Sequence, residues 1–170
     1  MAELTQKEKL QPSLLDRLTD DTPSEVQESR DDRVLSIQRL RECVLRDLGW
    51  LLNTECHESV SEIEDYPHVR SSVINFGIPT LSGLTASGMD LNRLEDQVRK
   101  AIIHFEPRIL KDSLTVKAIN DSEVMSRKTL SFEIEGELWA QPVPLKMYLK
   151  TELDLETGTV SISEIADSAH

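Results

Sequence analysis

The stretch HFEPRIL, residues 104–110, places a carboxylate and a guanidinium on either side of a proline. Glu106 and Arg108 are two positions apart, so in an extended segment both project to one side, and Pro107 restricts the backbone between them. Three roles suit such a pair: acid–base catalysis, internal bracing of the fold, and bidentate hydrogen bonding to a partner. The residue types alone leave a helix-ending ion pair and a binding site equally open.

A catalytic role for Glu106 requires a second, well-placed acid. Glycoside hydrolases hold two carboxylates roughly 5–9.5 Å apart across a sugar cleft. The chain has 31 acidic residues, so chance pairs are inevitable, and only Glu106 has a distinctive setting. Arg108 beside it opposes a proton-donating role, and aromatic residues, which stack on sugars, make up only 4% of the chain. The sequence therefore argues against an enzyme.

Other reactive side chains lack the spacing that their chemistry needs. The cysteines and histidines considered as ligands are scattered: Cys43, Cys56, His57, His68 and His104. They form no C-x-x-C or H-x-x-x-H pattern, so we expect no metal. No G-x-S-x-G nucleophile motif occurs, and GLTASG at 83–88 lacks the lysine of a phosphate-binding loop. We therefore expect no cofactor and no small-molecule substrate.

The net charge of −12 is concentrated toward the two ends of the sequence. Residues 1–32 carry 9 acids and 4 bases, residues 151–170 carry 5 acids and no base, and the stretch between carries 17 acids and 15 bases. Without a basic stripe we expect no nucleic-acid partner, and an acidic surface disfavours anionic membranes. Two cysteines, no apolar leader and no membrane-length apolar run favour a cytoplasmic protein without direct membrane insertion.

Hydrophobic periodicity predicts the elements that position the Glu-Pro-Arg motif. Apolar residues at helical spacing predict an amphipathic helix over about 33–53, with Asp31 or Asp32 as its cap. Residues 54–69 are expected to form a polar loop, followed by a short helix that reaches about Asn75 and is ended by Gly77.

A second amphipathic helix is predicted to begin at the N-cap Asp90 and to end at about Phe105. It ends there because Pro107 disfavours helical geometry at Glu106. We therefore expect Glu106 to Arg108 to form an extended exit that carries an exposed ion pair. An exposed pair is worth about 0–1 kcal/mol, so truncating either side chain should leave the isolated fold nearly intact.

Beyond the motif, the apolar period changes from 3.6 to 2, which predicts short antiparallel strands within 113–163 with one face in solvent. Glu133, Glu135 and Glu137 on one predicted strand and Lys146 and Lys150 on the next suggest cross-strand pairs. Helices followed by strands predict an α+β fold, in which N-terminal helices pack on one face of a small antiparallel β-sheet.

We divide the chain into an acidic, largely flexible N-terminal arm over residues 1–32, a single α+β domain over residues 33–163 and an acidic tail over residues 164–170. The arm contains one apolar patch, SLLDRL, in which Ser13 caps a short helix. Three leucines share a face of that helix: Leu14, Leu15 and Leu18. Because so short a helix is unstable alone, we expect these leucines to dock on the domain or on a partner.

Four blocks of the sequence resemble TssE, the family of baseplate subunits of bacterial type VI secretion systems. The blocks are PSLLDRL at 12–18, RLRECVLRDLGWLLNT at 39–54, YPHVRSSVINFGIP at 66–79 and FEPRI at 105–109. That family is similar to the gene-25 wedge protein of contractile phage tails, historically called lysozyme-like. The blocks occur in the family's order, and the resemblance extends over nearly everything from Pro12 to Ile162.

The resemblance implies a non-catalytic assembly protein in the cytoplasm, in the baseplate of a membrane-docked secretion apparatus. It implies wedge partners, TssF, TssG and TssK, and a sheath built from TssB and TssC, whose subunits exchange strands. On this basis we expect Glu106, Pro107 and Arg108 to contact a partner. The alternative is a glycan-cleaving, lysozyme-like enzyme.

A small antiparallel sheet is also expected to have a free edge, with unpaired N–H and C=O groups that a further strand can use. Strand exchange among sheath subunits, which the resemblance implies, makes this edge the expected sheath-initiating surface. We place the Glu-Pro-Arg motif on the opposite flank of the strand region, facing the wedge.

Overall fold

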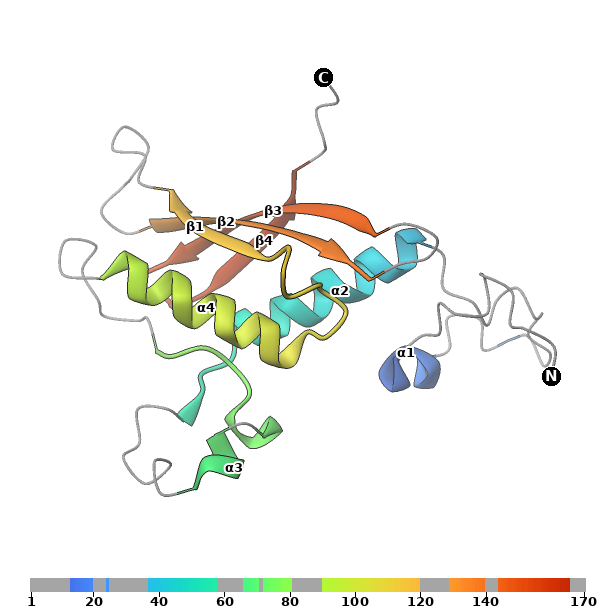
Figure 1. The fold of residues 1–170 in the computed structure, drawn as a ribbon, viewed down its shortest axis with the longest axis horizontal. Coiled ribbons are helices and arrows are strands. Elements are labelled where there is room, and N and C mark those ends of the chain that lie inside the picture. Colours follow the sequence, from blue (N-terminus) through green and yellow to red (C-terminus); the bar gives the residue numbers. More distant parts are fainter. Residues whose placement is uncertain are drawn as a thin grey trace.

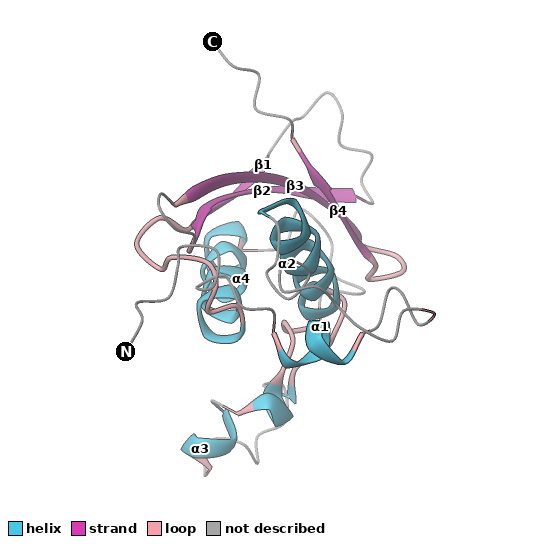
Figure 2. Ribbon diagram, turned by 90° about the vertical axis from the view of Figure 1, so that its right-hand side faces the viewer, coloured by secondary structure: helices cyan, strands magenta, loops and turns pink. Residues whose placement is uncertain are grey.

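Two long helices and a four-stranded sheet dominate the structure, which is a computed structural model. The described residues are 13–19, 24, 37–57, 66–70, 72–80, 90–119, 129–139 and 144–165. Helices α2 (Ile37–Leu52) and α4 (Leu91–Phe105) lie together beneath the sheet (Figure 1). Viewed from the side, both helices cover the same face (Figure 2). The predicted α+β fold, with helices packed on one face of an antiparallel sheet, is confirmed.

The sheet is an antiparallel meander in the order β1-β2-β3-β4. Its strands are β1 (Thr115–Ile119), β2 (Thr129–Leu138), β3 (Leu145–Asp154) and β4 (Val160–Glu164). β1 and β4 are therefore the two edge strands. β4 includes Glu164, one residue beyond the limit of 163 given to the domain above, and the division into arm, domain and tail remains a prediction.

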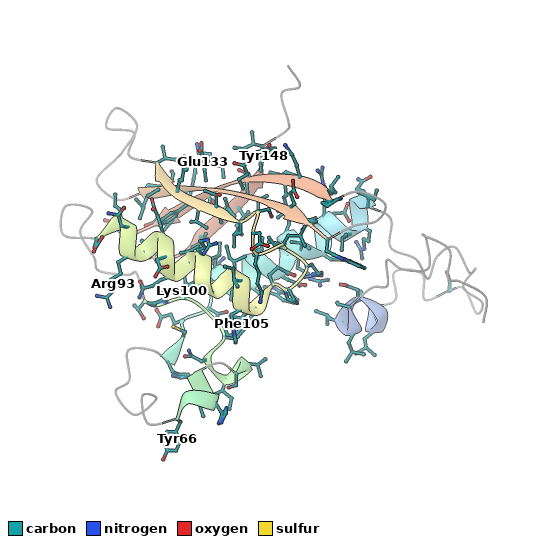
Figure 3. The ribbon with its side chains drawn as sticks, in the orientation of Figure 1. Tyr66, Arg93, Lys100, Phe105, Glu133 and Tyr148 are labelled. Carbon is teal, nitrogen blue, oxygen red and sulfur yellow. The ribbon has the colours of Figure 1, made fainter. Side chains whose placement is uncertain are left out.

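The outer face of the sheet carries the charges that the sequence alternation predicted. Glu133 lies opposite Lys150, and Glu137 lies opposite Lys146, in the register of β2 with β3. Lys150 nevertheless forms its ion pair along its own strand, with Glu152 at 3.4 Å. Figure 3 shows Glu133 pointing away from the helices. Opposite charges therefore do lie across from each other on β2 and β3, but these described side chains do not form the cross-strand ion pairs that we expected.

The core lies between the inner face of the sheet and the two long helices. Its fully buried side chains come from both layers: Val44, Leu48, Leu51, Ile102, Leu130, Ile134, Leu138, Met147, Leu149 and Leu153. α4 begins where the sequence predicted, since the Asp90 carboxylate accepts a hydrogen bond from the Arg93 N–H at 3.2 Å. It ends at Phe105, also as predicted. The expected start of the first long helix and its caps fall outside the described residues.

A small lobe, drawn below the helices in Figure 1, contains α3 (Pro67–Arg70) and the 3-10 turn η4 (Val73–Asn75). The polar loop predicted to reach residue 69 is wrong at its end, because Pro67 starts α3, where its fixed φ suits a first helical turn. Gly77 does end the segment, with φ +128°. A Cβ there would lie 2.3 Å from the Thr54 carbonyl oxygen, so this close crossing requires glycine.

Candidate functional site

The Glu-Pro-Arg motif forms a tight turn, and the extended exit predicted from the sequence is wrong. The Ile109 N–H donates to the Glu106 carbonyl at 3.2 Å, which closes the turn. The chain then runs beside the end of β2, where the Trp139 N–H donates to the Arg108 carbonyl at 2.7 Å. Proline explains the end of the helix, but this pairing with a later strand determines the path that follows.

Glu106 and Arg108 form a closely bonded pair. Arg108 Nε donates to Glu106 Oε1 at 2.7 Å, and Nη2 donates to Oε2, so the contact is bidentate. The Arg108 backbone N–H also donates to Oε1, at 3.1 Å. The Glu106 side chain is only 3% exposed and that of Arg108 is 23% exposed. The prediction of an exposed pair is therefore wrong, and the pair is an internal brace.

A second carboxylate, Asp47 of α2, completes the brace. Arg108 Nη2 donates to Asp47 Oδ2 as well as to Glu106, so one guanidinium joins α2 to the turn after α4. Burial alone would lower the pKa of Arg108, but Glu106 and Asp47 outweigh burial and raise that pKa above its ordinary value. Sequence reasoning missed Asp47. Its one signal was its position beside Leu48, at the margin of the apolar stripe of α2.

The brace continues through Arg46 into the N-terminal helix α1 (Leu14–Leu18). Arg46 Nη2 lies 2.8 Å from Asp47 Oδ1 and 2.8 Å from Asp16 Oδ1. We call the resulting series of alternating charges the charge row: Asp16, Arg46, Asp47, Arg108 and Glu106. It connects three segments of the chain, α1, α2 and the turn after α4.

Asp16 joins α1 to α2 through its contacts with Arg46 and Cys43. Its carboxylate and the Ser13 hydroxyl form a capping box, with Asp16 N–H to Ser13 Oγ at 3.3 Å. Burial would raise the pKa of Asp16, but hydrogen bonds from Ser13, Arg46 and Cys43 lower it to about 2. Burial and the Asp16 contact raise the pKa of the Cys43 thiol, so Cys43 is a packing residue rather than a nucleophile.

The α1 leucines face away from this contact. Leu14 and Leu18 are 73% and 75% exposed, and Leu15 is also exposed. The structure therefore does not place them against the domain, one of the two docking sites that we expected. The helix that carries them is connected to the Glu-Pro-Arg motif only through Asp16 and the rest of the charge row. Trp50 adds a further exposed apolar side chain, with its ring centroid 5.0 Å from the Arg46 guanidinium carbon.

The isoleucine that follows the motif explains an unusual glycine in β2. Ile109 is buried, and a Cβ added at Gly136 would lie 3.1 Å from its Cγ2 atom. The sequence showed Gly136 only as a break in the apolar alternation. In the structure the glycine admits Ile109, so the segment carrying the motif lies close against the sheet.

This arrangement is poorly suited to acid–base catalysis. The second acid that the sequence could not identify is present, but Asp47 and Glu106 share one guanidinium and Glu106 is enclosed. A cavity of about 180 Å³ lies away from the charge row, between the end of α2 and Thr157 to Thr159. Within the described residues, no group of three or more acids, histidines or cysteines is placed to hold a metal.

At each edge of the sheet, side chains bond only part of the outward backbone groups. At β1, two side chains one turn apart on α4 bond the edge: Glu95 accepts from the Ala118 N–H at 2.7 Å, and Arg99 donates to the Leu114 carbonyl at 3.1 Å. At β4, the Thr159 carbonyl and the Ile165 N–H bond to β3, so by alternation the groups of Ile162 and Glu164 point outward. In the described part of the chain these outward groups have no partner.

These observations define the protein as a two-layer α+β module with an internal charged brace and a partly open sheet edge. The model of the family described as baseplate wedge protein gp25 matches residues 38–143, from α2 to beyond β2. The chain belongs to this family. No curated protein and no solved structure matches the chain significantly.

Family membership makes the protein a structural baseplate wedge component of contractile tail-like machinery, and not an enzyme. Its partners are accordingly other baseplate proteins. The glycan-cleaving alternative is therefore wrong. Among the described helices, none is long and apolar enough to cross a membrane.

Proposed function

We propose that this protein is the TssE-type baseplate subunit of a type VI secretion system. It would act in the cytoplasm, in the baseplate of a membrane-docked apparatus. There it would join the wedge proteins TssF, TssG and TssK to the sheath proteins TssB and TssC. The gp25 family match supports the baseplate role, and the four TssE-like blocks support the type VI assignment.

The wedge-facing surface in this proposal comprises α1 and the Glu-Pro-Arg turn. α1 supports it because Leu14, Leu15 and Leu18 are exposed while Asp16 holds the helix in place. At the turn, Pro107 is exposed, and the Arg108 side chain is partly exposed, at 23%. Glu106 itself is enclosed, so its role is to hold Arg108 in position for a partner rather than to touch that partner.

The sheath-facing surface is the β4 edge, and the observation that carries the templating role is the unpaired backbone of Ile162 and Glu164. A sheath strand can add there by main-chain hydrogen bonds. The β1 edge is the poorer candidate because Glu95 and Arg99 of α4 bond it on both sides of Val116. The unpaired stretch between those contacts is therefore shorter than the one at Ile162 and Glu164. The segment after the motif also pairs with β2 on its β1 side, which supports wedge and sheath surfaces on opposite flanks.

Replacing Ile162 with proline tests this proposal. Its N–H points away from β3, so proline should remove only an outward donor and be tolerated at an edge. We expect Ile162→Pro to abolish sheath initiation by TssB and TssC while the wedge still co-purifies. Ile162→Val, which keeps the N–H, is the matched control. Normal sheath polymerisation from a baseplate that carries Ile162→Pro would refute templating at β4.

A further inference from the structure

The β4 edge is not open along its whole length, because the side chain of Asn53, the residue that follows α2, already occupies one position. Asn53 Nδ2 donates to the Val160 carbonyl at 2.9 Å, and Asn53 Oδ1 accepts from the Val160 N–H at 2.9 Å. A single amide thus bonds both outward groups of one β4 residue, as the backbone of a neighbouring strand would. Pairing by another chain is blocked at Val160 while this contact persists.

The other end of the same edge is bonded by Arg41, which lies within α2. Its Nη2 donates to the Lys146 carbonyl at 2.8 Å, and its Nη1 lies 3.3 Å from Glu164 Oε1. Lys146 lies two residues before Tyr148, whose carbonyl accepts from the Ile165 N–H. Because backbone groups alternate along a strand, the Lys146 carbonyl points to the same side, beyond the end of β4. The outward groups of Ile162 and Glu164 therefore lie between Asn53 and Arg41.

The flank of α2 between Arg41 and Asn53 contains a glycine, Gly49, that the fold does not require. Arg41, Leu45 and Gly49 recur at i+4 spacing along α2, and Asn53 continues this row in the turn that follows, where its N–H donates to the Gly49 carbonyl at 3.2 Å. Leu45 packs against the core, and a Cβ added at Gly49 would meet nothing within 4 Å. Glycine within a helix is unfavourable, and here neither a close neighbour nor a positive φ requires it.

We propose that Asn53 and Arg41 are stops that fix the register of an incoming strand, and that the open space beside Gly49 receives one of its side chains. This inference rests on strand addition at β4, the function proposed above. The sheet curves around α2 on the β4 side (Figure 2), so an added strand lies over this flank of the helix. Leu45 and Ile162 are half-buried and apolar, so the inserted side chain is apolar.

The occupant is an extended segment of a partner protein that carries basic residues, rather than a second copy of β4. Residues 151–170 hold 5 acids and no base. Pairing two β4 edges would bring two such acidic stretches together, and like charges on paired strands are destabilising. A strand with lysine or arginine beside its apolar side chain complements this edge.

Hydrogen exchange on the isolated protein tests the stops. We expect the Val160 amide to be at least tenfold better protected than the amides of Ile162 and Glu164, and Asn53→Ala to remove that difference. When a baseplate is assembled with TssB and TssC, Ile162 and Glu164 should become protected. Equal exchange at the three amides of the isolated protein would overturn the role of Asn53.

Filling the space beside Gly49 tests whether this space receives a side chain of the partner strand. In cells that express labelled TssB and TssC, we expect Gly49→Leu to reduce sheath assembly at least tenfold. Lys100→Leu, at an exposed position on α4, should leave assembly normal.

The outcomes separate this inference from the proposed function. If Ile162→Pro blocks assembly and Gly49→Leu does not, the role of the space beside Gly49 is wrong and strand addition stands. If Ile162→Pro has no effect, the proposed function itself fails. A dimer that Ile162→Pro dissolves would overturn the partner-strand assignment.

Discussion

Arg108 is the residue whose loss should most affect the isolated fold. Arg108→Ala leaves the Glu106 carboxylate enclosed without its cation and separates Asp47 from the turn. Removing one member of such a pair is costly, and with Arg108 partly exposed we expect the free energy of unfolding to fall by about 2–4 kcal/mol. Chemical denaturation measures this. The expectation replaces the near-neutral effect predicted for an exposed pair.

Lys100→Ala is the control for that measurement, since Lys100 pairs with Asp96 on the exposed surface of α4. Its effect should stay within about 0.5 kcal/mol. Similar, small effects of both substitutions would mean that the pair at the turn contributes no more than a surface ion pair.

The sequence identified Glu106 and Arg108 as partners, but Asp47 comes from a distant helix. Its contact depends on tertiary packing that spacing alone does not reveal.

Asp16 should make the attachment of α1 sensitive to acid. Its pKa of about 2 in the folded protein is below the value of about 3.9 expected in an unfolded chain. The stabilisation is therefore complete above about pH 4 and is lost as the pH falls toward about 2. Hydrogen exchange of the Thr19 amide, which bonds to Leu15, should accelerate over this range relative to the exchange rate of the same amide in the unfolded chain.

Asp16→Asn provides the control, because its amide does not titrate. In this variant we expect Thr19 to exchange rapidly at every pH while the Ile102 amide of the core stays protected. Unchanged protection of Thr19 in Asp16→Asn would show that α1 is held by other contacts.

At the scale of the elements, two glycines should respond to alanine in opposite directions. Gly77→Ala forces a Cβ to within 2.3 Å of the Thr54 carbonyl oxygen at φ +128°, so we expect a loss of about 2 kcal/mol or more. Gly49→Ala adds a methyl group in open space on α2 and should stabilise by about 0.5–1 kcal/mol. Thermal melts of both variants provide the comparison. A stabilised Gly77→Ala protein would contradict the crossing at Thr54.

The elements themselves were largely predictable from periodicity. α2, α4 and the four strands each bury one regular stripe of side chains, which appears as a 3.6 or 2 period in the sequence. α3 and the turn at Glu106 lack such a stripe. Their geometry depends on Pro67 at a helix start and on hydrogen bonds from β2, and the second of these is not local. Which backbone groups at the sheet edges stay unpaired was equally hidden, because Glu95, Arg99, Arg41 and Asn53 decide it.

For the whole molecule, α1 should matter to assembly more than to folding. Its leucines are exposed and its attachment is polar, so Leu14→Ser with Leu18→Ser should leave the melting temperature unchanged within about 2 °C. We expect the same variant to lose co-purification with TssF and TssG, because exposed apolar side chains on a fixed helix suit a groove in a partner.

Ile37→Ser is a suitable control for that experiment, since Ile37 is an exposed apolar residue on α2 rather than on α1. It should retain the wedge partners. Normal wedge recovery with the leucine variant would exclude α1 as a docking surface. A large fall in its melting temperature would instead show that the leucines support the isolated fold.

The contact between Asn53 and Val160 also has a consequence for how the protein is made. The two residues are 107 positions apart, so a ribosome synthesises α2 long before β4. β4 completes the meander last of its four strands, when Asn53 and Arg41 have already emerged. An unguarded edge is most hazardous in a nascent chain, where neighbouring polypeptides are close. The order of synthesis therefore restricts the β4 edge from the moment it forms.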